Sequence, residues 1–80
     1  MEEVTNEMII NCLEFIQDAG GEVSRYSLDL YITRNIGITE SFNIVPKKLV
    51  DEGFIDIMRE EKGIKTILTP IGVDKIKMPR

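Results

Sequence analysis

The sequence contains no histidine and only one cysteine, Cys12. Histidine is the commonest general base near neutral pH and the commonest metal ligand, so its absence argues against an enzyme and against a metal site. A single cysteine cannot form an internal disulfide, which is typical of a reduced intracellular compartment. We therefore expect a cytoplasmic protein that is not an enzyme and needs no cofactor.

Long hydrophobic runs are also missing. No apolar run exceeds three residues, and the run at Met8-Ile9-Ile10 follows the acidic Glu2 and Glu3. We expect neither a membrane-spanning helix nor a signal peptide. The composition, 42% hydrophobic and 30% charged, is that of one folded domain over residues 1–80. Because a core this small supplies only roughly 3–5 kcal/mol of net stability, self-association is expected.

The net charge of −4 by itself disfavours a nucleic-acid partner. The charge is unevenly distributed along the chain, however. Residues 1–40 carry two basic and eight acidic groups, whereas residues 41–80 carry eight basic and six acidic groups. Any surface that binds a polyanion is therefore expected in the second half.

Three stretches have apolar residues at the three- and four-residue spacing of amphipathic helices: residues 5–19, 24–35 and about 40–52. Thr5 and Ser24 are suitable N-caps for the first two. Glycines follow all three stretches and supply the left-handed conformation that often ends a helix. These patterns predict three helices.

Pro46 interrupts the third stretch. If that helix starts at Thr39, the proline lies beyond the first turn, where it removes a backbone hydrogen bond and crowds the preceding turn. We therefore expect either a kink or a helix that begins around Asn43.

The pattern changes to extended chain after Gly53. Residues 54–59 and 64–68 are rich in isoleucine and are joined by a short connection that ends in Gly63, which predicts a β-hairpin. Thr69-Pro70 then pairs an N-cap with a proline at the first helical position and predicts a short helix to about Lys77. A short extended piece is also expected at Glu22-Val23.

Two runs resemble a known family. Lys47–Ile55, with the letters KKLVDEGFI, resembles the end of the recognition helix and the entry to the wing in MarR-like regulators. Ile67–Gly72, with the letters ILTPIG, resembles the exit from the same wing. With the turn at Ile36–Thr39, the resemblance covers most of the chain. It implies an α+β winged helix: a three-helix helix-turn-helix core, a two-stranded hairpin wing at about 54–69 and a short C-terminal helix.

The resemblance implies that the third helix enters the major groove of double-stranded DNA and that the wing contacts phosphates. On the outward face of that helix, Asn43 could pair with an adenine edge and Lys47 with guanine or phosphate. Arg25, at the start of the second helix, could contact the DNA backbone. The candidate DNA-binding residues are Ser41, Asn43, Ile44, Lys47, Lys48, Arg59, Lys62, Lys65 and Arg25.

Each of these residues also has a plain structural interpretation. The polar ones could form an ordinary solvated surface, and the charges at the hairpin tip could serve solubility. Leu49, Gly53 and Phe54 are expected to serve folding. Cys12 is expected in the core or an interface, since it lies on the apolar stripe of the first helix. Two tyrosines on the second helix, at positions 26 and 31, could stack on bases or complete the core.

Two functions remain open. The first is a small DNA-binding transcriptional regulator, homodimeric through its first and last helices, in which the cations of residues 40–52 and of the hairpin tip form a continuous electropositive ridge. The alternative is a winged-helix module that binds protein and not DNA. In that case the acidic side chains of the first helix, Glu7, Glu14 and Asp18, would meet a basic partner.

Overall fold

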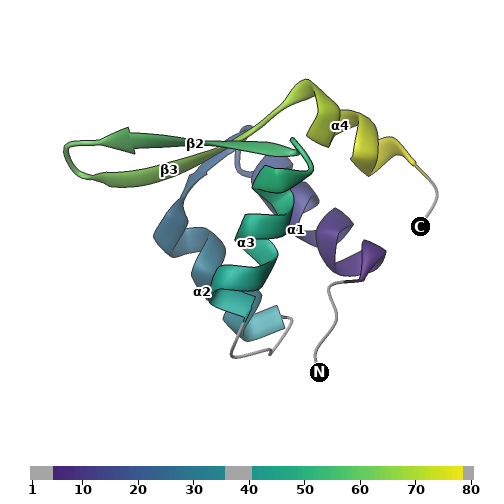
Figure 1. The fold of residues 1–80 in the computed structure, drawn as a ribbon, viewed down its shortest axis with the longest axis horizontal. Helices are drawn as coiled ribbons and strands as arrows, with labels where there is room; N and C mark the ends of the chain where they lie inside the picture. Colours follow the sequence, from purple (N-terminus) through teal and green to yellow (C-terminus); the bar gives the residue numbers. More distant parts are fainter. Residues whose placement is uncertain (1–4, 36–40, 79–80) are drawn as a thin grey trace.

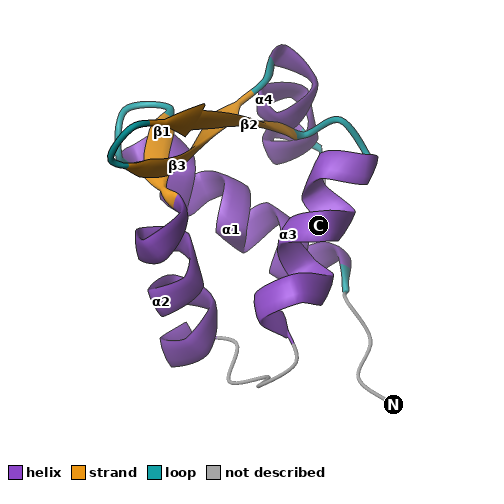
Figure 2. Ribbon diagram, turned by 60° about the vertical axis from the view of Figure 1, so that its left-hand side comes forward, coloured by secondary structure: helices purple, strands orange, loops and turns teal. Residues whose placement is uncertain are grey.

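The computed structural model describes residues 5–35 and 41–78 of the chain. Within these residues, helices and strands follow one another in the predicted order, which confirms the α+β class (Figure 1, Figure 2). The elements are α1 (Asn6–Asp18), β1 (Glu22–Ser24), α2 (Arg25–Asn35), α3 (Ser41–Asp51), β2 (Ile55–Glu60), β3 (Gly63–Leu68) and α4 (Pro70–Lys77).

Helix α1 begins at a capping box and ends at two glycines. The Thr5 hydroxyl accepts a hydrogen bond from the backbone N–H of Met8 at 3.2 Å, and the Thr5 N–H donates to the Met8 sulfur at 3.5 Å. Gly20 and Gly21 have φ of 100° and 97°, a region that favours glycine, and the chain turns there into β1. The buried residues of the helix form the predicted stripe: Ile9, Ile10, Cys12, Leu13 and Ile16.

The sheet is antiparallel, with β3 between β1 and β2. The β2–β3 hairpin is the predicted wing. The short extended piece expected at Glu22-Val23 is β1, which pairs with β3 in the register Val23–Thr66 and adds a third strand to the sheet. The Thr66 hydroxyl strengthens this pairing by donating to the Val23 carbonyl at 3.0 Å.

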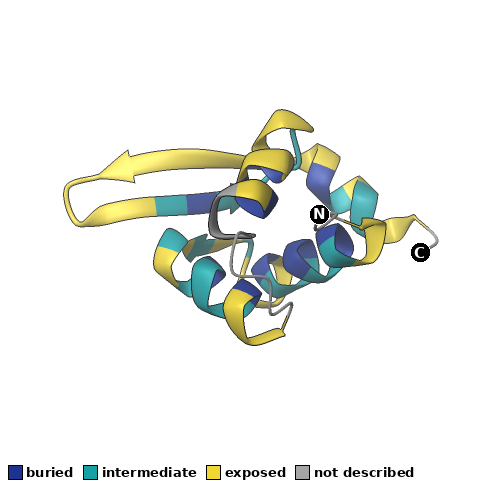
Figure 3. Ribbon diagram, turned by 60° about the horizontal axis from the view of Figure 1, so that its bottom comes forward, coloured by how far each residue is buried: buried dark blue, intermediate teal, exposed yellow. Residues whose placement is uncertain are grey.

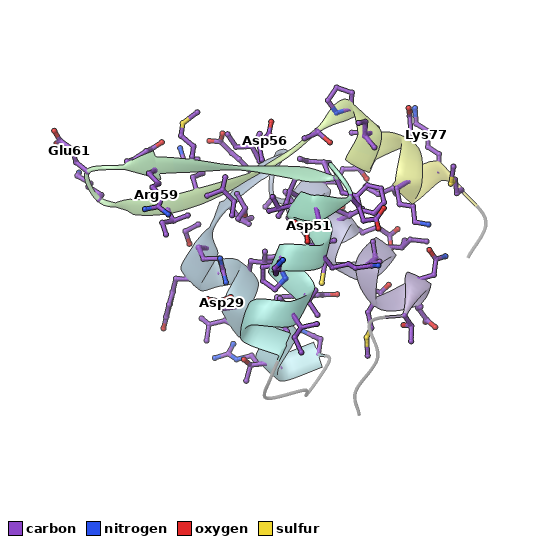
Figure 4. The ribbon with its side chains drawn as sticks, in the orientation of Figure 1. Asp29, Asp51, Asp56, Arg59, Glu61 and Lys77 are labelled. Carbon is purple, nitrogen blue, oxygen red and sulfur yellow. The ribbon has the colours of Figure 1, made fainter. Side chains whose placement is uncertain are left out.

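Alternate residues of the hairpin lie on opposite faces of the sheet. Ile57 and Arg59 share a face with their cross-strand partners Thr66 and Ile64. Because Thr66 and the nearby Ile55 are buried, this inner face looks toward the helices. In Figure 4, Arg59 accordingly extends to the helix side of the wing and Asp56 to the other side. The outer face carries Asp56, Met58 and Lys65.

The core lies between the three long helices and the inner face of the sheet. Leu28 and Ile32 of α2 meet Val45 and Leu49 of α3 and the stripe of α1, and none of these four side chains is exposed. Figure 3 shows the buried positions lining the facing sides of the helices, while the far half of the wing is exposed. Only the base of the wing therefore contributes to the core.

Helix α3 runs without a break from Ser41 to Asp51 (Figure 1), so a start near Asn43 is wrong. Pro46 lies inside the helix with its ring fully buried, and this burial offsets part of the cost of the missing backbone hydrogen bond. The expected start at Thr39 falls outside the described residues. At the other end, Gly53 has φ of 79° and Phe54 donates its N–H to the Leu49 carbonyl at 2.9 Å.

The Thr69 side chain links the start of α4 to the end of α3 through hydrogen bonds. The Thr69 hydroxyl donates to the Gly53 carbonyl at 2.6 Å and accepts from the Gly72 N–H at 3.0 Å, so it caps α4 and fixes the exit from α3. A side chain at Gly72 would overlap the Phe54 carbonyl oxygen. In the described part of the chain, every helix is too short or too polar to cross a membrane.

Candidate nucleic-acid interface

The outward side of α3 carries an apolar residue, a cation and an acid in one row. Ile44, Lys47 and Asp51 are exposed, and their spacing of three and four residues places them on one side of the helix. The Lys47 ammonium lies 3.3 Å from the Asp51 carboxylate, with side chains 75% and 61% exposed. Ser41 and Asn43 belong to the same helix, but their side chains are outside the described residues.

Lys48 lies beside this row and is paired in the same way. Its ammonium is 3.4 Å from the Glu52 carboxylate, one helical turn further on. Both pairs are solvent-exposed, and exposed ion pairs of this kind stabilise a protein by only about 0–1 kcal/mol. Either lysine can therefore exchange its carboxylate for another anion at small cost.

Arg59 and Lys62 are the wing cations without an ion-pair partner in the described part of the chain. Arg59 lies on the inner face of β2, and Lys62 lies in the turn between β2 and β3. Within residues 5–35 and 41–78, neither side chain forms an ion pair. Figure 4 shows Arg59 beneath the wing and Glu61 at its tip. These two cations are free to contact an external anion.

Lys65 has a different position from the other wing cations. It lies on the outer face of the sheet, 3.2 Å from Glu60 and 3.3 Å from Glu22. Hydrogen bonds to Glu60 and Glu22 raise the pKa of its ammonium. Lys65 is therefore directed away from α3 and is held by two carboxylates.

Arg25 connects α2 to the surface formed by α3 and the wing. Its guanidinium Nε lies 3.0 Å from Asp29, and both side chains are only 25% exposed. A hollow of about 380 Å³ lies between α2, α3 and the inner face of β2. We call it the α3–wing hollow; its lining residues are Arg25, Pro46, Lys47, Val50, Asp51 and Ile57.

A second hollow lies between the start of α2 and the tip of the hairpin. It measures about 430 Å³ and is lined by Ser24, Arg25 and Tyr26 together with hairpin residues that include Lys62 and Ile64. Arg25 thus borders both hollows. Both are open depressions, and α3 lies below the wing in Figure 1.

The fold has close structural neighbours. F93 from STIV, a winged-helix DNA-binding protein, superposes with a TM-score of 0.71 and 18% identity, over 96% of this chain and 85% of that protein. The oxidized form of MarR from E. coli superposes with a TM-score of 0.67 and 16% identity, over 86% of this chain and 48% of MarR. The chain folds as a winged helix. No known family model matches the sequence, and no curated protein matches it either.

In this winged helix the predicted electropositive ridge is not continuous. Carboxylates alternate with the cations: Asp51 and Glu52 follow the two lysines of α3 by one turn, and Glu60 approaches Lys65 on the wing. The cause is spacing, since residues four apart on a helix are neighbours and diagonal residues on a hairpin come within reach of long side chains. Of the described cations proposed to bind DNA, Arg59 and Lys62 are the two that form no ion pair.

The sequence interpretation missed two residues of this surface. Val50 and Ile57 line the α3–wing hollow and are partly exposed. The alternation Ile55-Asp56-Ile57 places Ile57 on the inner face of the wing, so the period of the strand could have found it. Val50 could have been found as the next residue in the row that runs from Ile44 through Lys47.

The two tyrosines of α2 have different environments. The ring of Tyr31 stacks on Phe15 with centroids 4.4 Å apart, and it packs against the core. Tyr26 is 71% exposed and borders the hollow at the hairpin tip. Of the two, Tyr26 alone remains available to an external partner. Among the residues that the structure describes, no three acidic, histidine or cysteine side chains are grouped to hold a metal ion.

Proposed function

We propose that this winged helix is a cytoplasmic DNA-binding transcriptional regulator that acts by binding and not by catalysis. One observation carries the proposal: cations from α2, α3 and the wing line two hollows that share Arg25, in a fold shared with a winged-helix DNA-binding protein. Arg25 and Lys47 line the α3–wing hollow, and Arg59 follows on the same face of β2.

Helix α3 is the part that reads sequence. Its width fits the major groove, where Lys47 would bind guanine or phosphate and Asn43 an adenine edge, with Ser41, Ile44 and Lys48 beside them. Arg59 and Lys62 on the wing and Arg25 on α2 would bind the flanking phosphates. Lys65 is the weakest of the proposed contacts, because Glu60 and Glu22 hold it on the outer face.

The carboxylates on this surface set the strength of binding and do not abolish it. Exposed pairs such as Lys47–Asp51 contribute about 0–1 kcal/mol, so a phosphate can displace the carboxylate. The displaced carboxylates still repel the DNA. We therefore expect each subunit to bind weakly and with a strong dependence on salt.

Two copies of the chain would bind one duplex. A symmetric dimer doubles the cationic contacts and reads two half-sites. Ile71 and Met78, at the two ends of α4, are exposed apolar residues suited to a contact between subunits. Sedimentation equilibrium should give the mass of two chains at the concentration used for DNA binding; the mass of one chain would overturn the dimer and leave DNA binding to be judged separately.

DNA binding is tested by removing the unpaired wing cations. Arg59→Ala and Lys62→Ala should each weaken binding to labelled random duplexes and lower the slope of log affinity against log salt by about one. Fluorescence anisotropy measures both quantities. Lys77→Ala, which removes an exposed cation of α4, is the control and should change neither. Equal effects of all three substitutions would contradict a wing contact with phosphate.

Protein binding without DNA is the second candidate, and one observation favours it. Of the six described cations proposed to bind DNA, Arg25, Lys47, Lys48 and Lys65 have a carboxylate within 3.4 Å. An acidic surface on α1 would then meet a basic partner. Suppose that a protein co-purifies with this chain, stays bound after nuclease treatment and binds the Lys47→Ala and Lys62→Ala variants equally well. That result would support protein binding over DNA binding.

A further inference from the structure

We propose that the surface formed by α3 and the inner face of the wing recognises the C5-methyl group of thymine in the major groove. The inference rests on the proposed DNA binding and adds what the site selects. Its basis is a set of three aliphatic side chains, Ile44, Val50 and Ile57, which are 41%, 37% and 39% exposed. We refer to them as the aliphatic patch.

The aliphatic patch combines two elements that are distant in the sequence. Ile44 and Val50 each lie three residues from Lys47 on the exposed part of α3, one on either flank of it and about 120° apart around the helix axis. Ile57 lies across the α3–wing hollow from Val50, on the inner face of β2. The interior is already filled by Val45, Leu49 and other buried side chains, so the patch is additional to the core.

The charges around the aliphatic patch indicate the chemistry of its partner. Lys47, Arg25 and Asp51 line the same hollow as Val50 and Ile57, with Asp51 3.3 Å from Lys47, and Arg59 follows Ile57 on the same face of the wing. A ligand that presents an apolar group next to anionic groups, which can displace Asp51 from Lys47 at small cost, therefore matches this surface. The major groove at an A·T pair has this arrangement, because the thymine methyl group lies in the groove between two rows of phosphates.

The described side chains of α3 offer few alternatives for reading bases. Lys47 is the residue proposed to bind guanine or phosphate, whereas Ile44 and Val50 beside it have no hydrogen-bonding group. Apolar contact with a methyl group is the recognition that aliphatic side chains can provide in the major groove. Uracil lacks this methyl group, and 5-methylcytosine carries one at the same ring position.

The inference is tested with the wild-type protein and two duplexes that differ only in the C5-methyl group of thymine. Affinity is measured by fluorescence anisotropy for an alternating A·T duplex and for the same duplex with uracil in place of thymine. The pairing edges are unchanged. We expect the thymine duplex to bind more tightly by roughly fourfold for each contacted methyl group, the ratio given by the transfer free energy of one buried methylene. A G·C duplex with 5-methylcytosine should likewise bind more tightly than one with cytosine.

Substitutions test which side chains produce the preference for thymine over uracil. Ile44→Ala, and the double change of Ile44 and Val50 to alanine, should reduce the thymine-to-uracil ratio toward one while binding through phosphates persists at low salt. Met58→Ala is the matched control, since Met58 adjoins Ile57 on β2 but lies on the outer face. It should leave the ratio unchanged. Circular dichroism verifies that each variant is folded.

The possible outcomes distinguish thymine recognition from the proposed DNA binding on which it rests. Binding of both duplexes with equal affinity by the wild-type protein would overturn thymine recognition and leave DNA binding intact. A thymine preference that Ile44→Ala and the double variant retain in full would assign it to another surface and overturn the inference too. Failure to bind any duplex at low salt would remove the proposed DNA binding, and thymine recognition with it.

Discussion

Cys12 shows how far the fold changes the chemistry of a single residue. The side chain is fully buried in the stripe of α1, and desolvation raises the pKa of its thiol from 9.0 to about 12. The thiolate is the reactive form of cysteine, so the native protein should react very slowly with thiol reagents near neutral pH. Cys12 is therefore a core residue, as the apolar stripe of α1 predicts.

The raised pKa predicts a loss of stability in alkaline solution. The native thiol keeps its proton up to about pH 12, whereas the unfolded thiol loses it from pH 9.0 upward. Unfolding then releases a proton, so the free energy of unfolding is unaffected below pH 9 and falls between pH 9 and 12, by up to about 1.4 kcal/mol for each pH unit. Urea denaturation at several pH values measures this slope.

Cys12→Ala supplies the comparison for the alkaline experiment. The variant loses buried volume and should be less stable at pH 8, but its free energy of unfolding should decline less steeply above pH 9. The pKa of Tyr31 is raised by desolvation and by the charge of Cys12, so the difference between the two proteins reports Cys12 together with its effect on Tyr31. Parallel curves for the two proteins would show that the thiol does not ionise differently in the two states.

Local spacing also decides which ion pairs can be predicted from the sequence. Lys47 and Asp51 are four residues apart in a predicted helix, so their pairing follows from helix geometry alone. The pairing of Lys65 with Glu22 joins residues 43 positions apart. It depends on the register of β1 against β3, which a three-residue strand is too short to reveal through its period.

At the scale of elements, α3 carries most of the proposed recognition and also the acids that oppose it. Asp51→Asn removes a negative charge from the outward side of the helix and leaves Lys47 without its carboxylate partner. DNA binding should become tighter, by up to roughly fivefold, which corresponds to an exposed pair of about 1 kcal/mol. Anisotropy titrations of the wild type and the variant measure the ratio.

Asp74→Asn is the control for this gain. Asp74 is exposed on α4, so the substitution changes the net charge equally but lies away from the proposed interface. A similar gain in both variants would mean that overall charge, and not the neighbourhood of Lys47, limits binding. If neither variant binds DNA more tightly than the wild type, the result would favour an α3 surface that does not bind DNA.

Most elements could be predicted because their signals are local. The stop at Gly53, the N-cap at Thr69 and the alternation in the hairpin each specify a boundary within a few residues. Two features could not be predicted in this way. Pro46 stays inside α3 because its ring is buried in the core, and β1 joins the sheet through long-range pairing. Both depend on tertiary packing, which overrides local preference.

At the scale of the whole molecule, the net charge of −4 conceals a local asymmetry. The wing extends away from the helices with Arg59 on its underside, and α3 lies on the same side of the molecule (Figure 1, Figure 4). Potential near a surface depends on charges within about one Debye length, roughly 8 Å at physiological salt. The proposal therefore relies on Arg59 and Lys62, which form no ion pair in the described part of the chain, to attract phosphate although the chain as a whole is acidic.

The salt dependence of binding to a labelled duplex is the most direct test of the account. Four cations, Arg25, Lys47, Arg59 and Lys62, are proposed to contact phosphate from each subunit. Log affinity should then fall linearly with log salt with a slope of about −3 to −4 for each bound subunit. Absence of binding at about 0.05 M salt, or affinity that does not change with salt, would contradict DNA recognition by this face of the winged helix.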